Sequence, residues 1–453
     1  MEGIVASPLE RLRRAALELR APETLVRCGG RVEEVSEAVC RVRGLSRFCA
    51  LGDCVEIQGD GGGLLAQVVQ ISPAGLLVKP FDAAARIRMG APVWRKGPLR
   101  IHPDASWKGR ILNALGEPLD GGLPPRPGAT PMAVDNPPPP ALRRQPVGGR
   151  VDTGVRAVDI FTPVCAGQRL GVFAGSGVGK STFLAMLAQA RGFDTVIFAL
   201  IGERGREVRD FIGGAIGEEH LERAIGVVAT GDESPMMRRL ALLTALTLAE
   251  YFRDRGEKVL FIADSVTRYA HACRDILLAA GEAPVARGYP PGIFSELPRL
   301  LERAGPGLEG AGSITAFLSV LVDGDDHNDP VADAIRGILD GHIVLDREIA
   351  EQGRYPAINV LASVSRLARN AWTEEQEKLV LMLRALIARF EDTRDLRLLG
   401  GYKPGVDEEL DRAVQWTPRI YDMLRQQPGE AREGENAFEL LARALRDEEI
   451  SGR

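Results

Sequence analysis

The sequence lacks any run of 18 or more apolar residues, so it does not predict a helix that spans a lipid bilayer. Its first residues, Met-Glu-Gly-Ile-Val-Ala-Ser-Pro, also lack the basic start, the apolar stretch and the cleavage site of a secretory signal. With 45% hydrophobic and 26% charged residues, the composition is typical of an ordinary globular protein. We therefore expect a cytoplasmic protein.

Cysteine and aromatic residues are scarce, and each scarcity argues against a class of site. The cysteines show neither a CxxC pair nor a spacing typical of metal ligands, so we interpret them as small buried hydrophobic residues. They are Cys28, Cys40, Cys49, Cys54, Cys165 and Cys273. Aromatic residues make up 5% of the chain, and a net charge of -5 gives no general attraction to nucleic acid. A nucleic-acid partner is therefore not expected.

The length of 453 residues predicts two or three domains, because one hydrophobic core rarely supports so long a chain. Residues 1–21 contain apolar positions at helical spacing, Leu9, Leu12, Ala16 and Leu19, which predict a short amphipathic helix. Two interpretations of this helix stay open: it packs on its own body, or it docks a partner.

Residues 22–95 are predicted to form a small β-barrel domain. Short β-rich runs such as Arg31–Val35, Ala38–Val42 and Cys54–Ile57 alternate with glycine-rich turns. Such barrels can bind single-stranded nucleic acid, but this segment holds nine Lys and Arg against eight Asp and Glu, with three aromatic residues. The stacking and the positive charge that nucleic-acid binding needs are therefore weak.

Residues 96–370 are predicted to form a parallel α/β domain. Asn136 is followed by four prolines, which predict an extended, stiff strap, and beyond it apolar strands alternate with helical segments. The expected strands are Arg169–Phe173, Thr195–Ile201, Ile225–Ala229, Lys258–Ala263, Ile314–Val322 and Ala357–Leu361. Residues 371–453 are predicted to form a C-terminal helical domain, in which Glu374–Phe390 and Asn436–Glu448 are the clearest helices.

A phosphate-binding loop follows the first of these strands, where residues 174–181 read Ala-Gly-Ser-Gly-Val-Gly-Lys-Ser. Glycines let backbone N–H groups approach the phosphates, and the following helix presents its positive end to them. Lys180 is expected to reach the β- and γ-phosphates, and Ser181 to supply a hydroxyl to Mg²⁺. Ala174 stands where the general pattern GxxxxGK[ST] has its first glycine, so the turn must begin in an ordinary backbone conformation. The predicted nucleotide-binding residues of this loop are Gly175, Ser176, Gly177, Val178, Gly179, Lys180, Ser181 and Thr182.

Carboxylates at the ends of two other expected strands supply further groups that ATP hydrolysis needs. Asp264 closes the strand that begins at Lys258 and is expected to hold the metal; the alternative is a helix N-cap. The loop after Ile201 carries Glu203 and Glu207, and in a parallel sheet this loop lies at the same edge as the phosphate-binding loop. One of these two carboxylates is expected to activate the attacking water. The spacing does not decide between them, and a solvated charge cluster is the alternative.

Several long motifs occur in the order typical of one family. They are Asp152–Asp159, Gly171–Ser181, Gly202–Val208, Asp264–Ala270, Arg287–Pro291, Asp323–Asp333 and Tyr355–Arg366. With these motifs the chain resembles, over nearly its whole length, the catalytic ATPases of flagellar and other type III protein-export systems, which are relatives of the F-type and V-type rotary ATPases. The resemblance implies an N-terminal β-barrel, a central RecA-like P-loop α/β domain and a C-terminal helical domain.

The phosphate-binding loop itself carries part of this resemblance. Alanine at position 174 is usual in that family, so the departure from the general pattern agrees with it. Ser176 and Val178 are typical of the flagellar branch, whereas injectisome ATPases tend to carry Ala or Gly at these positions. The resemblance therefore implies an ATPase that uses ATP and Mg²⁺ in flagellar protein export, with an injectisome ATPase as the alternative.

Five residues outside the loop receive roles from the resemblance. Glu203 matches the residue that polarises the attacking water, with Glu207 nearer a supporting role and Arg204 in the same catalytic loop. Tyr355 matches the residue that stacks on adenine; from the sequence alone, a plain core aromatic is the alternative. Arg366 matches an arginine finger that reaches into the neighbouring subunit's site, with a structural ion pair as the alternative.

Partners follow from the same resemblance. The family implies a homohexamer, a dimeric regulator bound at the N-terminal helix, a coiled-coil central stalk subunit, and contacts with the export gate and with chaperone–substrate complexes. Peripheral association with the inner face of the cytoplasmic membrane is implied as well. Three rival functions remain: an ATP-synthesising rotary catalytic subunit, a hexameric RNA translocase and a non-catalytic nucleotide-binding ring subunit. The intact set of Lys180, Glu203 and Asp264 argues against the last, and the charge-balanced barrel argues against RNA.

Overall fold

The computed structural model describes residues 27–59, 62–322, 329–430 and 436–446. The chain divides into two compact units, one built on residues up to Pro80 with Ala84–Pro98, the other on Phe81–Ala83 with the chain from Leu99 onward. The amphipathic helix expected within residues 1–21 lies outside the described residues, and the domain boundaries expected from the sequence stay predictions. Within the described ranges, no helix is both long and apolar enough to cross a membrane.

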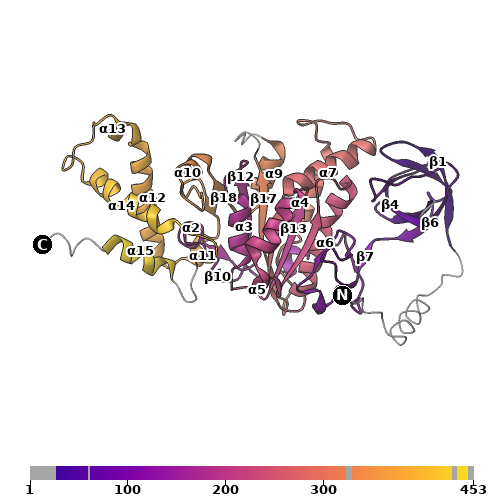
Figure 1. The fold of residues 1–453 in the computed structure, drawn as a ribbon, viewed down its shortest axis with the longest axis horizontal. Coiled ribbons are helices and arrows are strands. Elements are labelled where there is room, and N and C mark those ends of the chain that lie inside the picture. Colours follow the sequence, from indigo (N-terminus) through magenta and orange to yellow (C-terminus); the bar gives the residue numbers. More distant parts are fainter. Residues whose placement is uncertain (1–26, 60–61, 323–328, 431–435, 447–453) are drawn as a thin grey trace, which may run out of the picture. The chain divides into compact units, whose positions relative to one another are not determined.

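The first unit is a closed β-barrel, drawn in indigo in Figure 1, and it confirms the barrel expected from the sequence. Its strands follow the order β1 (Gly29–Val35), β2 (Cys40–Arg43), β5 (Gly75–Pro80), β4 (Gly62–Ser72), β3 (Cys54–Gly59) and β6 (Pro92–Gly97), and β6 pairs with β1. Along β3, Val55 and Ile57 are fully buried, while Glu56 between them is partly exposed and forms an ion pair with Lys96. This period of two is what a small barrel requires, because every strand turns one face toward the core.

The second unit is built on a nine-stranded sheet in which most neighbouring strands run parallel (Figure 1). Its main path follows the order β19 (Val364–Ser365), β18 (Gly341–Leu345), β12 (Arg169–Ala174), β17 (Ser313–Leu321), β15 (Lys258–Asp264), β13 (Thr195–Ile201), β14 (Ala224–Ala229) and β8 (Ile111–Leu112), and β16 (Gly305–Pro306) pairs with β17. β13 is buried at every position, as expected of a central parallel strand that is covered on both faces. The predicted parallel α/β architecture is therefore confirmed.

One expected strand is wrong, and the strand that takes its place beside β12 was missed. Residues Ala357–Leu361 form no strand: Ile358 makes a single bridge to Leu345, and the side chain of Asn359 accepts hydrogen bonds from two backbone N–H groups that follow it. An asparagine that bonds its own following backbone favours a turn over an extended strand. The strand beside β12 is instead β18, which pairs with it in parallel.

Helices cover the sheet and connect its strands. α6 (Pro235–Arg253) packs on β13, β14 and β15, and α7 (Val266–Ala279) packs on β13 and β17. Other helices in the described part of this unit are α2 (Arg156–Phe161), α3 (Lys180–Ala188), α4 (Gly205–Arg209), the π-helix Asp210–Ile216, α5 (Glu218–Leu221), α8 (Pro291–Leu301), α9 (Pro330–Ile338), α10 (Arg347–Glu351), α11 (Ala368–Ala371), α12 (Glu374–Asp392), α13 (Arg394–Leu398), α14 (Glu408–Leu424) and α15 (Ala437–Arg446).

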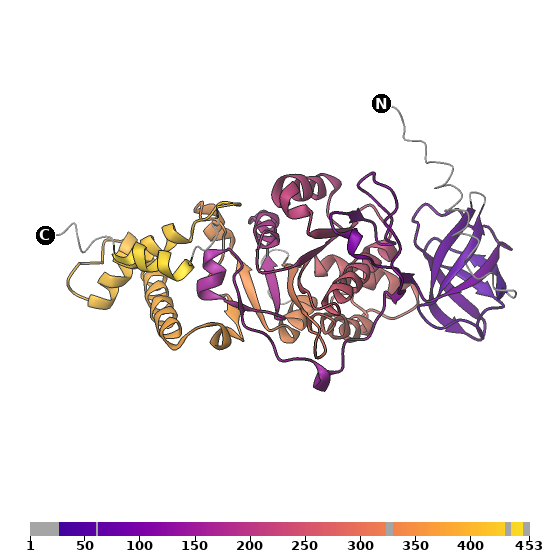
Figure 2. The same ribbon diagram turned by 90° about the horizontal axis from the view of Figure 1, so that it is seen from below.

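The C-terminal helices gather at one end of this unit (Figure 2), with α12 packed against α14 and α14 against α15. A capping box starts α12: the hydroxyl of Thr373 accepts from the N–H of Gln376 at 3.2 Å, and the Gln376 side chain accepts from the N–H of Thr373 at 3.1 Å. The expected helix Glu374–Phe390 is confirmed. The helix expected at Asn436–Glu448 is confirmed up to Arg446, where the described residues end.

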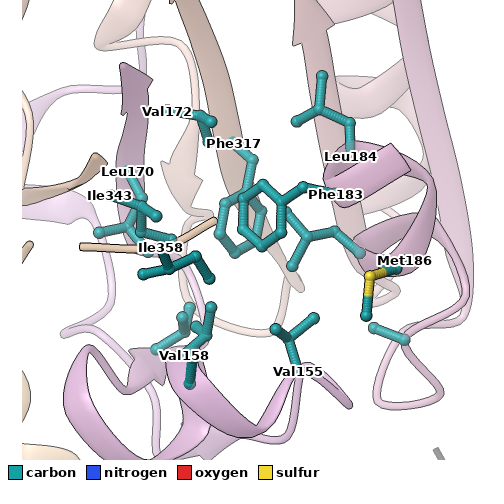
Figure 3. Close-up of a cluster of buried hydrophobic side chains, with 14 of the residues drawn as sticks. Val155, Val158, Leu170, Val172, Phe183, Leu184, Met186, Phe317, Ile343 and Ile358 are labelled. Atoms are coloured by element: carbon teal, nitrogen blue, oxygen red, sulfur yellow. The ribbon is translucent and has the colours of Figure 1, made fainter. Parts of the chain in front are cut away.

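The central hydrophobic core holds the helix that follows the phosphate-binding loop. Figure 3 shows Phe183 of α3 together with Val172 of β12 and Phe317 of β17, and Ile343 and Val158 belong to the same buried cluster. Because α3 and β12 bury side chains in the same cluster, both ends of the loop are fixed by apolar contacts.

A buried ion pair joins α6 to the chain that follows α8. The guanidinium of Arg303 donates to both carboxylate oxygens of Glu250, at 2.7 and 2.9 Å, and to the carbonyl oxygen of Val134 at 2.9 Å. Asn136, at the start of the proline strap, donates to the same carboxylate at 3.0 Å. Only 2% and 3% of the Arg303 and Glu250 side chains are exposed, so each charge relies on the other and not on water.

Glu250→Ala should therefore lower the free energy of unfolding by about 3–5 kcal/mol, because it leaves the Arg303 guanidinium buried without its counter-charge. Glu408→Ala is the matched control, since Glu408 pairs with Arg412 but has 89% of its side chain exposed, and this change should cost less than about 1 kcal/mol. Chemical denaturation followed by circular dichroism measures both. Equal losses in the two variants would contradict the special weight of the buried pair.

Candidate nucleotide-binding site

The phosphate-binding loop joins β12 to α3. Ala174 is the last residue of β12 and pairs in the sheet with Leu321 and Leu345, so the alanine occupies an extended position that needs no glycine. Gly177 and Gly179 have φ values of 80° and 87°, in the left-handed region that glycine adopts without strain. The loop leads directly into the first turn of α3, an arrangement that can bind phosphate groups through backbone N–H donors.

Tyr355 lies directly against this loop. A Cβ atom at position 179 would stand 3.3 Å from two carbons of the Tyr355 ring, so any residue other than glycine would crowd the ring. The tyrosine is 42% exposed, which argues against a plain core aromatic. The ring expected to stack on adenine is thus next to the loop expected to hold the phosphates.

Exposure separates the loop residues into anchors and accessible groups. Gly175 and Val178 are buried, and Val178 belongs to the central hydrophobic core. Ser176, Ser181 and Thr182 are exposed. A ligand can therefore reach these three polar residues while the valine fixes the loop to the body of the domain.

Three charged side chains meet at the edge of the sheet where this loop lies. β13 and β15 are parallel neighbours with Leu200 opposite Asp264, so Glu203, just past the end of β13, lies beside Asp264. The Nζ atom of Lys180 forms an ion pair with the Asp264 carboxylate and lies 3.5 Å from Oε1 of Glu203. The side chains of Lys180, Glu203 and Asp264 are 12%, 14% and 3% exposed. One lysine is thus shared by two carboxylates in a site with little access to water.

The protonated form of Glu203 is more favoured in this site than it would be in water. Burial raises the pKa of this carboxyl, Lys180 opposes the increase, and the charge of Asp264 adds to it. A carboxylate with a raised pKa is a stronger base, which suits a group that takes a proton from water.

The same edge offers oxygen ligands for a divalent cation. Asp264 supplies a buried carboxylate at the end of β15, and Ser181 supplies a hydroxyl in the first turn of α3. The N-cap of α7 is Ser265, whose hydroxyl accepts from the N–H of Arg268 at 3.3 Å, so the capping role is already filled. One carboxylate and one hydroxyl fit Mg²⁺, which usually takes few protein ligands and completes its shell with water and substrate phosphates.

The remaining residues of the expected catalytic loop are more exposed. Arg204 has 84% of its side chain exposed and lies 3.7 Å from Glu207, which is 40% exposed. An ion pair this exposed contributes little to stability. Of the two acidic candidates, Glu203 is the one that reaches Lys180, whereas Glu207 pairs with Arg204.

Arg366 lies at the opposite edge of the sheet. It follows β19, in which Ser365 pairs with Gly341, the first residue of β18. The N–H of Arg366 donates to the carbonyl oxygen of Asp340 at 2.9 Å. The N–H of Asp340 in turn donates to the carbonyl oxygen of Arg169, the first residue of β12, also at 2.9 Å. The six residues of β12 then rise by roughly 16 Å before the phosphate-binding loop begins. That separation exceeds the reach of an arginine side chain.

Two arginines that the sequence analysis did not single out also border the site. Arg268, in the first turn of α7, packs on the Glu203 loop, since a Cβ atom at Gly202 would stand 3.2 Å from three of its side-chain carbons. Arg347 donates from Nη2 to the carbonyl oxygen of Ser176 at 3.4 Å. A sequence signal existed for Arg268, which follows Asp264 by one helical turn. Arg347 follows β18, the strand that the sequence analysis missed.

Comparisons with known proteins agree with this geometry. Residues 154–365 match the nucleotide-binding domain of the ATP synthase alpha/beta family, and residues 372–443 match the T3SS EscN ATPase C-terminal domain. The chain is 56% identical over 425 residues to the flagellum-specific ATP synthase of Rhizobium meliloti (strain 1021), which covers 94% of this chain and 91% of that relative. The chain belongs to the family of flagellum-specific ATP synthases. It is an ATPase of the type III export class.

Solved structures of related ATPases share the fold of this flagellum-specific family member. The assembled ATPase EscN from the enteropathogenic E. coli type III secretion system matches with a TM-score of 0.84 at 36% identity, covering 92% of this chain and 100% of that chain. EscN in complex with its central stalk EscO matches equally well. The SPI-2 type 3 secretion system ATPase of Salmonella typhimurium is 42% identical over 437 residues, covering 96% of this chain and 99% of that relative. The barrel, the nucleotide-binding α/β domain and the C-terminal helices thus form a fold shared with injectisome ATPases.

Gly179→Ala should weaken ATP binding by at least about tenfold, because an alanine at φ 87° is strained and its Cβ atom would press on the Tyr355 ring. Titration of a fluorescent ATP analogue measures the effect. Gly337→Ala is the control, since Gly337 lies in α9 with open space around it, and its Kd should stay unchanged. Unchanged affinity in the Gly179 variant would show that nucleotide binding does not use this loop conformation.

Proposed function

We propose that this chain hydrolyses ATP at the interfaces of a homohexameric ring, and that the ring energises flagellar type III protein export. The observation that carries the proposal is the division of charged groups between two edges of one sheet. Lys180, Glu203 and Asp264 lie at one edge, and Arg366 lies at the other. One chain alone therefore lacks a group that phosphoryl transfer uses, whereas neighbours arranged head to tail supply it to each other.

At the first edge, the chain's own residues bind and orient the substrate. Lys180 neutralises charge on the β- and γ-phosphates, and Tyr355 stacks on adenine. Glu203 orients a water molecule whose oxygen bonds to the γ-phosphorus as the bond to the ADP oxygen breaks, and the carboxylate takes the released proton. Ser181 and Asp264 would hold Mg²⁺, which would neutralise phosphate charge there.

The exposed pair Arg204 and Glu207 supports this chemistry from the same loop. Burial raises the pKa of Glu203, and a hydrogen bond with Glu207 adds to the increase, so Glu207 helps to keep the neighbouring carboxylate basic. Arg204, whose side chain is 84% exposed, adds a positive charge on the same loop.

Arg366 completes the site of a neighbouring subunit. A guanidinium brought to the transferring phosphoryl group stabilises its charge and is worth about 10³ to 10⁵ in rate. The distance between Arg366 and its own phosphate-binding loop supports action on another chain. EscN occurs as an assembled ATPase and in complex with its central stalk EscO, and by likeness we infer that this chain forms a ring that engages a coiled-coil stalk subunit.

The flagellar assignment rests on sequence. Identity is 56% to the flagellum-specific ATP synthase of Rhizobium meliloti and 42% to the SPI-2 ATPase of Salmonella typhimurium. On this assignment, residues 1–21 bind a dimeric regulator, and the ring meets the export gate and chaperone–substrate complexes. It then works in the cytoplasm, at the inner face of the cytoplasmic membrane.

Lys180→Ala should lower kcat for Mg-ATP hydrolysis by at least about 10²-fold, because the phosphates lose a preorganised positive charge. Cells that produce only this variant should release far less flagellin into the medium. Lys378→Ala, at an exposed position of α12, is the control and should preserve both activities. Normal flagellin release by cells whose ATPase activity is abolished would contradict the export role while leaving the ATPase assignment intact.

Arg366→Ala subunits and Glu203→Gln subunits should each be inactive alone, yet mixed rings should regain part of the activity. Restoration is expected because some interfaces then join an intact Glu203 to an intact Arg366 from the next chain, and the arginine is worth about 10³-fold or more. Steady-state ATPase assays on rings shown to contain both chains measure this. A mixture no more active than its components would assign both residues to the same subunit's site.

A further inference from the structure

Gln168 is a buried polar residue one position before β12, at the edge of the sheet where Arg366 lies. We propose that Gln168 is a positioning residue for Arg366: its side-chain amide fixes the backbone that presents this arginine to the neighbouring subunit. The inference rests on the proposed function, because it requires that Arg366 act in a second chain's site.

The amide of Gln168 connects three separate segments. Its Nε2 atom donates to the carbonyl oxygen of Asp340 at 3.1 Å and to the hydroxyl of Ser365 at 2.9 Å, and its Oε1 atom accepts from the N–H of Cys165 at 2.9 Å. The residue is 0% exposed, so water does not compete for these bonds. Asp340 and Ser365 are the residues that hold Arg366, because the Asp340 carbonyl oxygen accepts the Arg366 N–H and Ser365 precedes it in the chain.

The backbone before Arg366 is fixed, whereas the arginine side chain is exposed. The hydroxyl of Ser365 donates onward to the carbonyl oxygen of Pro163 at 2.8 Å, which anchors β19 to the chain before β11 (Val164–Cys165). Arg366 itself is exposed, and its Nη2 atom lies 3.5 Å from the carbonyl oxygen of Arg336, at the long limit of a hydrogen bond. A fixed backbone lowers the entropy lost when an exposed side chain is placed in a partner's site.

Arg169 holds the same turn by charge. The Asp340 carboxylate accepts from the N–H, Nε and Nη2 of Arg169 at 3.0, 3.1 and 3.2 Å. Two consecutive residues, Gln168 and Arg169, therefore form hydrogen bonds with Asp340. Gln168 also bonds Ser365. Gln168 directly precedes β12 and Arg169 is its first residue, so the anchor of Arg366 and the phosphate-binding loop lie at opposite ends of one strand.

Mixed rings test the placement of Arg366 separately from the nucleotide site of the same chain. Gln168→Met keeps a long unbranched side chain but removes every polar atom, and should lower kcat by about 10- to 100-fold through misplacement of Arg366. Binding of ATP to the same variant should stay within about twofold, because the finger acts in the transition state. Mixing Gln168→Met with Glu203→Gln subunits should restore activity, since the Gln168 variant keeps an intact site and receives a well-placed arginine from its neighbour.

A second mixture controls for general effects of mixing. Gln168→Met combined with Arg366→Ala should gain no activity over Gln168→Met alone, because neither chain supplies a well-placed arginine. If Arg366→Ala with Glu203→Gln recovers activity but Gln168→Met with Glu203→Gln does not, the positioning role is wrong and the proposed function stands. If neither of these two pairs recovers, catalysis at the interface fails and the positioning role fails with it.

Milder variants keep the test decisive where Gln168→Met does not fold. Ser365→Ala removes one of the two acceptors of the Gln168 amide and should behave like the Gln168 variant in both mixtures, with a smaller loss of kcat. Ser363→Ala is the matched control: its buried hydroxyl bonds the N–H of Val344 and the carbonyl oxygen of Asn359, outside the Gln168 contacts, and kcat should stay within about twofold. Equal losses in the two serine variants would overturn the specific role of Gln168.

Discussion

The common direction of the central strands is the constraint on which the rest of the molecule depends. β12, β13 and β15 are parallel members of one sheet, so the loops that follow them open at one edge. Lys180, Glu203 and Asp264 lie at or just beyond the ends of these three strands, and they meet although no two of them are near in sequence. In this poorly hydrated setting their charges act on one another strongly, and the pKa of Glu203 is raised by burial and by Asp264 against the effect of Lys180.

The same constraint keeps Arg366 away from that group of charges. β18 runs parallel to β12, and β19 turns back antiparallel, so Arg366 falls at the edge where β12 begins. An arginine there is exposed while its backbone is fixed by Asp340, and this placement supports the proposal that Arg366 acts in the site of another chain. Under the proposed function, the need for a ring follows from strand direction, before any interface is considered.

The sequence predicted what local pattern encodes. Continuous apolar runs such as Thr195–Ile201 are strands buried on both faces, and the glycine spacing around Lys180 marked the phosphate-binding loop. β18 was missed because it has five residues and includes a half-buried histidine, while Ala357–Leu361 was mistaken for a strand because its apolar residues conceal the turn made by Asn359. Such patterns do not predict contacts between distant positions. Gln168 bonds Asp340 and Ser365, which lie 172 and 197 positions further along the chain, and the sequence around Gln168 gives no sign of these contacts.

Gln168 directly precedes β12, the strand that runs from the edge where Arg366 lies to the edge where the phosphate-binding loop lies. β12 is flanked by parallel partners on both sides, β17 and β18, and its residues from Leu170 to Ala174 are buried. A strand held in this way has little room for one end to shift alone, because its neighbours are closely packed on both sides. The backbone that presents Arg366 and the loop that carries Lys180 are attached to the two ends of this strand, so a displacement at one end is felt at the other. Under the proposed function, this strand would connect the nucleotide site of one subunit with the site that its Arg366 completes in the neighbour. A small shift at one nucleotide would then reach the next interface through a packed element.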